Sequence, residues 1–157
     1  GVDLSASALD EARTYLKEIA NKGLHHKDML KAVEDTDSAF DVIFSGFAVH
    51  HLDAADKQRL FSACAERLAP GGEFILVDVV REDGQTREQY LDGYLNCMRT
   101  QWMEVLPEHL DEACAHVSAY DFPETLADLT QMAKQAALSE PQIIGRYQQH
   151  YILRFTA

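Results

Sequence analysis

The feature that most constrains the fold is a pair of short apolar runs separated by one amphipathic helix. Residues 40–44 read Phe-Asp-Val-Ile-Phe, and residues 74–80 read Phe-Ile-Leu-Val-Asp-Val-Val. Such runs are typical of strands that are buried on both faces, as in parallel sheets. Between them, Asp53 precedes a helical pattern that extends to about Leu68 and stops at the Pro-Gly-Gly turn at 70–72. A strand, a helix and a second strand in this order predict a parallel β-α-β unit.

Alternating elements continue upstream of this unit. Residues 1–4 look like the end of a strand, and Ser7, with Asp10 three residues later, predicts the start of a helix that reaches about Ala20. A brief second strand ends at Asp28.

The second half of the chain is expected to be helical before two strands close it. Helix starts are predicted at the capping box formed by Thr86 and Gln89, at Pro107, and at Pro123, which would begin a helix over 123–138. The strands 142–147 and 150–156 are joined by so few residues that they are predicted to pair as an antiparallel hairpin. The sequence therefore predicts an α/β fold whose mostly parallel sheet carries helices on both faces and ends in this hairpin.

Composition predicts a single domain over residues 1–157, and it argues against several partners. A net charge of −12 disfavours nucleic acid, and no apolar stretch is long enough to cross a bilayer. The cysteines Cys64, Cys97 and Cys114 are odd in number, widely spaced and without a C-x-x-C pair. We therefore expect each cysteine to be a small apolar residue of the core, and neither a disulfide nor a zinc site. A reducing, cytoplasmic location agrees with this usage.

Ligands of open parallel sheets bind beyond the carboxyl ends of the strands, so the residues there carry the functional expectation. In this chain those positions hold Asp3, Asp28, the segment Ser45-Gly46-Phe47, and Asp78.

Four motifs occur in order along the chain: Gly1-Val2-Asp3-Leu4-Ser5, Phe40–Ser45, Val49-His50-His51-Leu52, and Leu68–Phe74. Together they resemble successive motifs of class I S-adenosylmethionine-dependent methyltransferases, in particular the branch that acts on small molecules. The closing hairpin resembles the last two strands of that Rossmann-like fold. The resemblance implies S-adenosyl-L-methionine as cofactor, S-adenosyl-L-homocysteine as product and a small-molecule methyl acceptor.

The resemblance also implies roles for the residues at the strand ends. Asp3 matches the acid that binds the ribose diol, and Leu4 would pack against the adenine. Asp28 matches the acid that accepts a hydrogen bond from the adenine amino group, with Met29 on the ring. Asp3 has a second interpretation, as a residue that favours a helix start.

Ser45, Gly46 and Phe47 are expected to pass beneath the methionine part of the donor. Methyl transfer is an in-line displacement, so orientation supplies much of the rate and no obligatory catalytic pair need appear. The segment Ser45-Gly46-Phe47-Ala48 replaces the Asn/Asp-Pro-Pro-Tyr type motif of enzymes that methylate exocyclic amines of bases or glutamine amides. DNA adenine and release-factor substrates are therefore disfavoured.

The two histidine doublets are not expected to bind a metal. Neighbouring side chains on a strand point to opposite faces, and on a helix they diverge by about 100°, so His50 and His51 should not reach one ion. The resemblance makes this pair mainly architectural, with His51 as the weak candidate for a general base. His25 and His26 are expected at the surface.

The segment 82–122 corresponds to a region that covers the substrate pocket in many relatives. Its large side chains would either line an apolar pocket or form a helix stripe packed on the sheet; they are Tyr90, Tyr94, Trp102 and Met103.

The glycine-rich motif of the family is not found, since none of the eight glycines has Gly-x-Gly-x-Gly spacing. The motif alignment places Gly1 inside the second strand of the family fold, which predicts that the first strand, its loop and its helix are missing. We therefore expect impaired donor binding by the chain alone and an unpaired strand edge at 40–45, which favours a homodimer, a sliding N-terminus or residues of a longer parent. The alternative function is a non-catalytic methyltransferase-like module that dimerises or acts as a scaffold. A nicotinamide-dependent oxidoreductase would also use Asp3 but leaves the later motifs unexplained.

Overall fold

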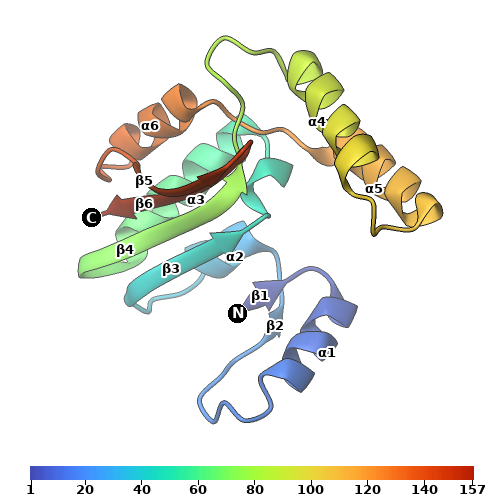
Figure 1. Ribbon diagram of the computed structural model, residues 1–157. Coiled ribbons are helices and arrows are strands. Elements are labelled where there is room, and N and C mark those ends of the chain that lie inside the picture. The colour runs from blue at the N-terminus through green and yellow to red at the C-terminus, as the bar shows by residue number, and fades with distance from the viewer.

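The computed structural model describes residues 1–157 and consists of a small N-terminal unit, a mixed sheet covered by helices, and a projecting helical pair (Figure 1). The strands are β1 (Val2–Asp3), β2 (His25–His26), β3 (Phe40–Gly46), β4 (Leu68–Val79), β5 (Gln142–Tyr147) and β6 (His150–Thr156). The helices are α1 (Ala6–Tyr15), α2 (Met29–Glu34), the 3-10 turn η1 (Val49–His51), α3 (Ala54–Arg67), α4 (Arg87–Gln101), α5 (Pro107–Tyr120) and α6 (Leu126–Gln135).

The strands form two separate sheets. β1 and β2 pair in parallel, and a four-stranded sheet has the order β3-β4-β6-β5. Within the larger sheet only β3 and β4 are parallel, whereas β6 runs antiparallel to both of its neighbours. The predicted α/β class and closing hairpin are confirmed, but a mostly parallel sheet is wrong. The reason is that β1 and β2 stay outside the larger sheet, while the hairpin adds two antiparallel pairings to it.

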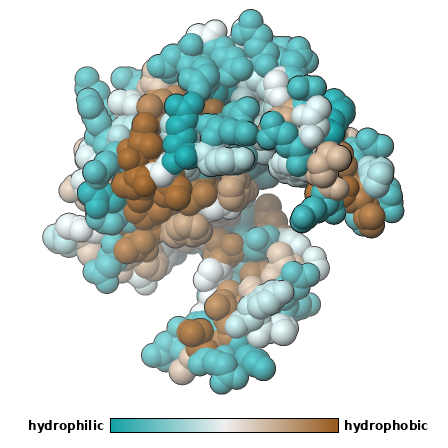
Figure 2. All heavy atoms as spheres, viewed as in Figure 1, coloured by the Kyte–Doolittle hydropathy of each residue, from teal (hydrophilic) through white to brown (hydrophobic).

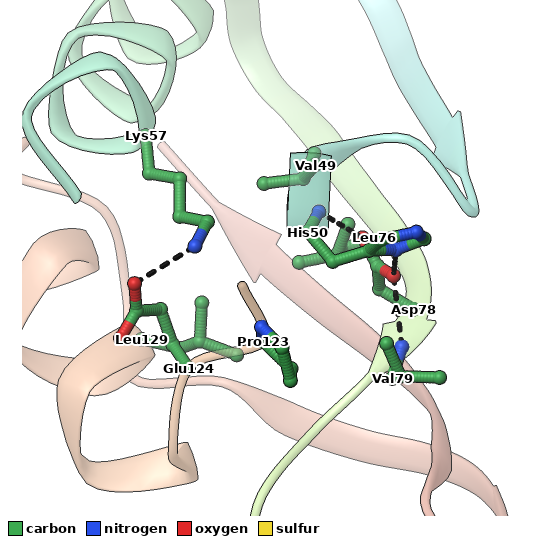
Figure 3. A pocket seen from close by; sticks show the side chains of 9 residues that line it. All are labelled: Val49, His50, Lys57, Leu76, Asp78, Val79, Pro123, Glu124 and Leu129. Carbon is green, nitrogen blue, oxygen red and sulfur yellow. Dashed lines mark hydrogen bonds and ion pairs between the residues drawn. The ribbon is translucent and has the colours of Figure 1, made fainter. Parts of the chain in front are cut away.

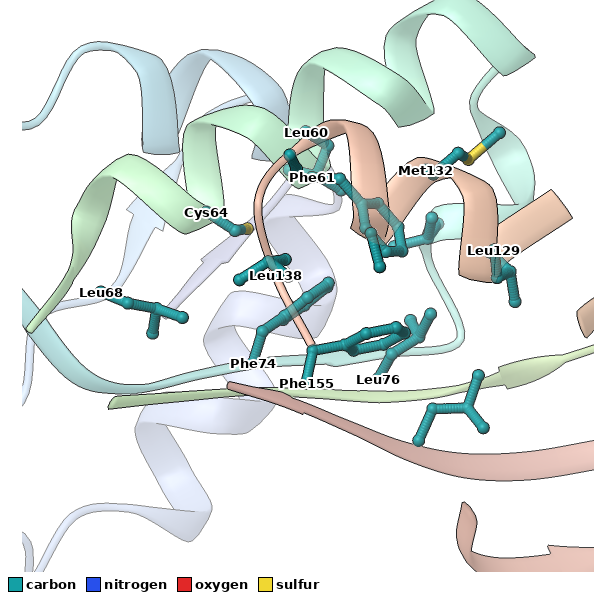
Figure 4. Packing of buried hydrophobic residues seen from close by; sticks show 14 of the residues in the cluster. Leu60, Phe61, Cys64, Leu68, Phe74, Leu76, Leu129, Met132, Leu138 and Phe155 are labelled. Carbon is teal, nitrogen blue, oxygen red and sulfur yellow. The ribbon is translucent and has the colours of Figure 1, made fainter. Parts of the chain in front are cut away.

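The main core lies on one face of the larger sheet. Phe61 of α3 packs edge-on against Phe74 of β4 and Phe155 of β6, with ring centroids 5.4 Å and 5.2 Å away, and all three side chains are fully buried. Leu129 and Met132 bring α6 onto the same cluster (Figure 4). This arrangement explains the apolar stripe of α3, which the sequence predicted from the helical spacing.

The opposite face of this sheet is mostly open, because only α4 reaches it, at the Val79 end of β4, so the expected full cover of helices on both faces is not found. Val42, Phe44 and Ile152 point to this face by strand register, and they are 56%, 66% and 36% exposed. Figure 2 shows a hydrophobic patch over the near face of the sheet. The prediction that residues 40–44 form a strand buried on both faces is therefore wrong, although the strand itself is confirmed.

β3 is also an edge strand, because its only partner is β4. β1 likewise has β2 as its only partner. The unpaired edge expected at residues 40–45 is therefore present. Around β1, the N-terminal unit is thinly packed, since Leu9 is the one buried side chain among residues 1–28.

Helix boundaries follow the expected caps at several positions. The side chain of Asp53 accepts a hydrogen bond from Asp56 N at the start of α3, Thr86 and Gln89 form a capping box, and Pro107 occupies the first turn of α5. Ser5, rather than Ser7, caps α1.

The remaining boundaries differ from the prediction. α1 ends at Tyr15 instead of about Ala20. Pro123 lies outside α6, because Thr125 forms the capping box there. The Pro-Gly-Gly segment belongs to β4, where the pairing with β3 is irregular between Phe40 and Val42.

The helices α4 and α5 form a hairpin that projects from the body (Figure 1) and has its own small cluster, which includes Tyr90, Tyr94 and Cys114. The segments that lead into and out of this hairpin lie side by side. Arg81 N donates to the Glu124 carbonyl (2.9 Å), the Arg81 guanidinium donates to the Pro123 carbonyl (2.6 Å), and Arg81 bridges to Thr125. None of the helices combines the length and the apolar character needed to cross a membrane.

Candidate functional site

Asp3 and Asp28 lie at the same end of the β1–β2 pair. Asp3 ends β1, and Asp28 follows β2 by two residues; between them the Lys27 amide donates to the Asp3 carbonyl (3.2 Å). Each carboxylate also has a local partner, because Asp3 accepts from Ser5 N (2.7 Å) and Asp28 from Lys31 N (2.9 Å), at the start of α2. The two acids therefore share one strand-end surface, as expected from their positions.

The apolar neighbours of these acids differ in accessibility. Leu4 is 66% exposed beside Asp3. Met29 is only partly accessible, because it packs against the main core. His25 and His26 form β2 and are exposed, in agreement with their expected surface position.

The segment Ser45-Gly46-Phe47 ends β3. The Phe47 amide donates to the Val77 carbonyl (2.8 Å), which continues the pairing with β4 for one more residue. Phe47 has a φ of 50°, a left-handed conformation that is unfavourable for a bulky residue. Its ring stays 54% exposed and meets His150 edge-on at 5.7 Å. The strained turn thus holds an aromatic side chain at the carboxyl end of β3.

A buried histidine–carboxylate pair joins η1 to the end of β4. The His50 amide donates to Asp78 Oδ2 (3.1 Å), and His50 Nδ1 hydrogen-bonds Asp78 Oδ1, which also accepts from Val79 N (2.8 Å) (Figure 3). The other ring nitrogen, Nε2, lies 3.5 Å from Asp121 Oδ1, just after α5. His50 is therefore held between two carboxylates.

His51 turns toward the same carboxylate. Its Nδ1 lies 3.6 Å from Asp121 Oδ1 and 3.1 Å from the Tyr120 carbonyl, and its ring centroid is 4.0 Å from that of His50. The two rings converge, so the expected divergence of the doublet is wrong. Neighbouring residues of a 3-10 turn still leave the backbone about 120° apart. The convergence therefore comes from the side-chain conformations of the two histidines and from Asp121, which reaches both rings from the end of α5.

The pKa values of His50 and Asp121 both lie above their ordinary values. Burial opposes the charge on His50, but the hydrogen bond and charge of Asp78 and the charge of Asp121 outweigh it, so the pKa of His50 lies above its ordinary value. Burial raises the pKa of the Asp121 carboxyl, although the nearby imidazoles act in the opposite direction. Both shifts favour a proton retained between His50 and Asp121.

A second buried polar group lies behind His50. Lys57 of α3 is 1% exposed, and its ammonium donates to Glu124 Oε1 (2.8 Å) and to the Phe122 carbonyl. Beside it is a cavity of about 10 Å³, the size of a single water, lined by the residues in Figure 3. Sequence reasoning missed Lys57, Asp121 and Glu124, because a lysine on an amphipathic helix and acids in a loop resemble ordinary surface residues.

The large side chains of segment 82–122 divide into two groups. Tyr90 and Tyr94 are buried in the small cluster with Val79, and the Tyr94 hydroxyl lies 3.1 Å from His150 Nε2. Trp102 and Met103 are 38% and 81% exposed. The packed stripe therefore describes the two tyrosines, while the role of this segment as a substrate cover stays a prediction.

The mixed sheet, its covering helices and its closing antiparallel hairpin match part of the Rossmann-like fold of solved methyltransferases. Residues 1–72 match the family described as "Methyltransferase domain". Over 81 residues, half of this chain, the sequence is 36% identical to demethylmenaquinone methyltransferase of Leptospira interrogans, of which it covers 32%.

Solved structures agree with this fold. An O-methyltransferase family protein from Burkholderia thailandensis superposes with a TM-score of 0.68 and 14% identity, over 96% of this chain and 41% of that one. A family 2 O-methyltransferase from Planctomyces limnophilus, solved in complex with apigenin, superposes with a TM-score of 0.68 and 17% identity, over 96% of this chain and 40% of that one. The chain thus spans about a third of the curated relative (32%) and about two fifths of these structures.

Proposed function

We propose that this chain belongs to an enzyme that transfers a methyl group from S-adenosylmethionine to a small organic molecule. The observation that carries the proposal is the position of Asp3 and Asp28 on adjacent strand ends within the segment that matches the methyltransferase family. An adenosine offers a ribose diol and an exocyclic amine, and ionised carboxylates accept hydrogen bonds from both. Asp3 would bind the diol, with Leu4 against the adenine, and Asp28 would bind the amine, with Met29 nearby.

Ser45, Gly46 and Phe47 would complete the donor site from the neighbouring sheet. The left-handed turn at Phe47 keeps its ring at the strand end, where it would bound the space around the reacting methyl group. The methyl group leaves a sulfonium in an in-line displacement, so the main demand on the protein is orientation. His51 is the more accessible base candidate, since its side chain is 35% exposed against 8% for His50.

The proposed acceptor is a small molecule rather than a macromolecule. The curated relative is named for demethylmenaquinone and one solved structure contains apigenin, both small organic molecules. The open sheet surface and the exposed Trp102 and Met103 offer apolar contact area for such an acceptor. A net charge of −12 makes a phosphate backbone an unfavourable partner.

Calorimetric titration with S-adenosylhomocysteine tests the donor site. We expect saturable binding that Asp3→Asn weakens by about 10-fold or more, because charge-assisted hydrogen bonds contribute about 1.5–3 kcal/mol each. Asp10→Asn is the matched control, since Asp10 is an exposed acid on α1 that pairs with Arg13. Equal affinity of wild type and Asp3→Asn would overturn the assigned role.

The alternative is a methyltransferase-like module that associates without catalysis. The unpaired edge of β3, with Phe44 exposed beside it, favours this candidate. The absence of Gly-x-Gly-x-Gly spacing also weakens the donor site of this chain alone. If the same titration shows no heat of binding and sedimentation shows a stable dimer, the result would support the non-catalytic module and reject the enzyme for these residues.

A further inference from the structure

Three potential metal ligands converge between η1 and the end of α5. Asp121 Oδ1 lies 3.5 Å from His50 Nε2 and 3.6 Å from His51 Nδ1. All three atoms lie within 4.8 Å of one another. Ligand atoms around a tetrahedral ion with bonds of about 2.0–2.1 Å are about 3.3 Å apart. The two histidine–carboxylate distances already lie close to this value, whereas the two histidine nitrogens, which are within 4.8 Å of each other, would move closer together on binding.

Asp121 supplies an independent sign of a missing partner. The residue is 3% exposed, and its Oδ1 atom is buried without a hydrogen-bond partner. A buried carboxylate oxygen without a partner is costly, and it is one of the features that an unrecorded ion explains. This oxygen faces the two imidazoles rather than any donor of the main chain.

The surroundings of His50 prepare its ring for a cation. His50 Nδ1 hydrogen-bonds the Asp78 carboxylate (Figure 3). This leaves His50 Nε2 on the side of Asp121, where its lone pair is available to a cation. A ligating histidine typically donates its other N–H to a carboxylate, which fixes the tautomer and the ring orientation. The Asp78–His50 pair has that arrangement, and Asp78 is itself anchored by two backbone amides.

We propose that His50, His51 and Asp121 bind one divalent transition-metal ion of the zinc type. Two imidazole nitrogens and one carboxylate oxygen favour such an ion over Mg²⁺ or Ca²⁺, which prefer oxygen ligands. A fourth ligand would approach from the His51 side, because the His51 side chain is 35% exposed. There the exposed His116 lies with its ring centroid 5.3 Å from that of His51.

This site replaces the expectation, made from the sequence, that the doublet could not reach one ion. It also makes two roles of His51 exclusive, because a nitrogen lone pair that binds a metal cannot accept a proton from a substrate. The competing occupant is a proton shared between His50 and Asp121. In that case His51 Nδ1 donates to the Tyr120 carbonyl instead of binding an ion.

Titration of the purified, tag-free protein with Co²⁺ tests the site by visible absorption, and calorimetry with Zn²⁺ gives the affinity. We expect one equivalent to bind, an intense tetrahedral Co²⁺ spectrum that chelator removes, and a raised melting temperature. His51→Gln should weaken binding by at least about 10-fold, and Asp78→Asn by about 10–100-fold through the orientation of His50. His109→Gln is the matched control, because His109 lies on α5 with its side chain 65% exposed and should change nothing.

Two results would overturn the proposal. One is the absence of a Co²⁺ spectrum at millimolar metal, which would assign the cluster to a proton. The other is equal affinity in wild type and His51→Gln. His51→Gln is the decisive variant, because His51 is partly exposed and its replacement leaves the buried Asp78–His50 pair intact. The readout needs no methyl donor, so its failure and a failure of S-adenosylhomocysteine binding remain distinguishable.

Discussion

The N-terminal unit and the sheet body differ sharply in how they are held together. Residues 1–28 contain two-residue strands and one buried side chain, Leu9. The body contains a seven-residue pairing between β4 and β6 and a core of 17 buried residues. Asp3 and Asp28 thus lie on the weakly packed part, whereas His50, Asp78 and Asp121 are buried where the α4–α5 hairpin meets the densely packed body. Low local stability is common where a protein binds a ligand, since binding can supply the missing order.

The largest expected effect is the loss of stability when a core side chain of the sheet body is removed. Phe61→Ala removes a fully buried ring between Phe74 and Phe155 and should lower the free energy of unfolding by about 3–5 kcal/mol. Urea denaturation followed by circular dichroism measures this loss. Leu9→Ala is the counterpart in the N-terminal unit; it should leave the global midpoint nearly unchanged and speed hydrogen exchange at the amides of His25 and Lys27. A shared midpoint shift would show that the two regions unfold as one.

The second prediction concerns the buried ion pair within the body. Lys57→Ala removes the nearest cation of the poorly exposed Glu124 and leaves it only the more distant Arg81 guanidinium at 3.7 Å. The change should cost about 3 kcal/mol, as for other broken buried pairs. Lys134→Ala, an exposed lysine in the last turn of α6, should stay within about 0.5 kcal/mol. Equal effects in thermal denaturation would mean that burial of the Lys57 ammonium has no energetic weight.

The third prediction separates stability from association. Phe44→Lys places a charge on the open face beside the unpaired edge, and it should change the free energy of unfolding by less than about 0.5 kcal/mol. Sedimentation should shift toward the monomer if this face mediates dimerisation. Tyr15→Lys on α1, 84% exposed, is the control that should not alter the distribution. Dimers that persist in Phe44→Lys would remove β3 as the interface.

The smallest effect uses the cysteines as reporters. Burial raises the pKa of the Cys64 thiol to about 12, so it stays protonated and unreactive near pH 8, whereas the partly exposed Cys97 should be labelled in the native protein. Mass spectrometry after thiol labelling in increasing urea should show Cys64 reacting only with global unfolding. Labelling of Cys64 below that transition would reveal local opening of the body.

Local features of the fold were predictable because they depend on neighbouring residues. The hairpin at 142–147 and 150–156 was predicted to the residue, and Asp53, Thr86 and Pro107 marked helix starts correctly. Whether the strands pair in parallel or antiparallel was not predictable from apolar runs. A run such as 40–44 does not reveal whether a strand lies on its second edge or a helix on its second face.

The candidate site likewise contains residues that were predictable from the sequence and residues that were not. The strand-end positions of Asp3 and Asp28 followed from the order of elements along the chain. The convergence of Asp121 on His50 depends on how a helix far along the chain returns to the sheet, and no pattern near either residue records it. Lys57 was hidden for a similar reason, since its burial depends on Phe122 and Glu124.

Arg81 and Thr125 form a β-bridge at the base of the α4–α5 hairpin, and this bridge makes a closed neck between the hairpin and the body. The neck has a consequence for how the hairpin can vary. Arg81, which leads from β4 into the α4–α5 hairpin, is hydrogen-bonded to Pro123 and Glu124, which lead out of the hairpin toward α6. Segments grafted onto such a neck can lengthen, shorten or exchange their sequence while β4 and β6 keep their register. The α4–α5 hairpin is thus a segment that protein engineers could exchange without disturbing the pairing of β4 with β6.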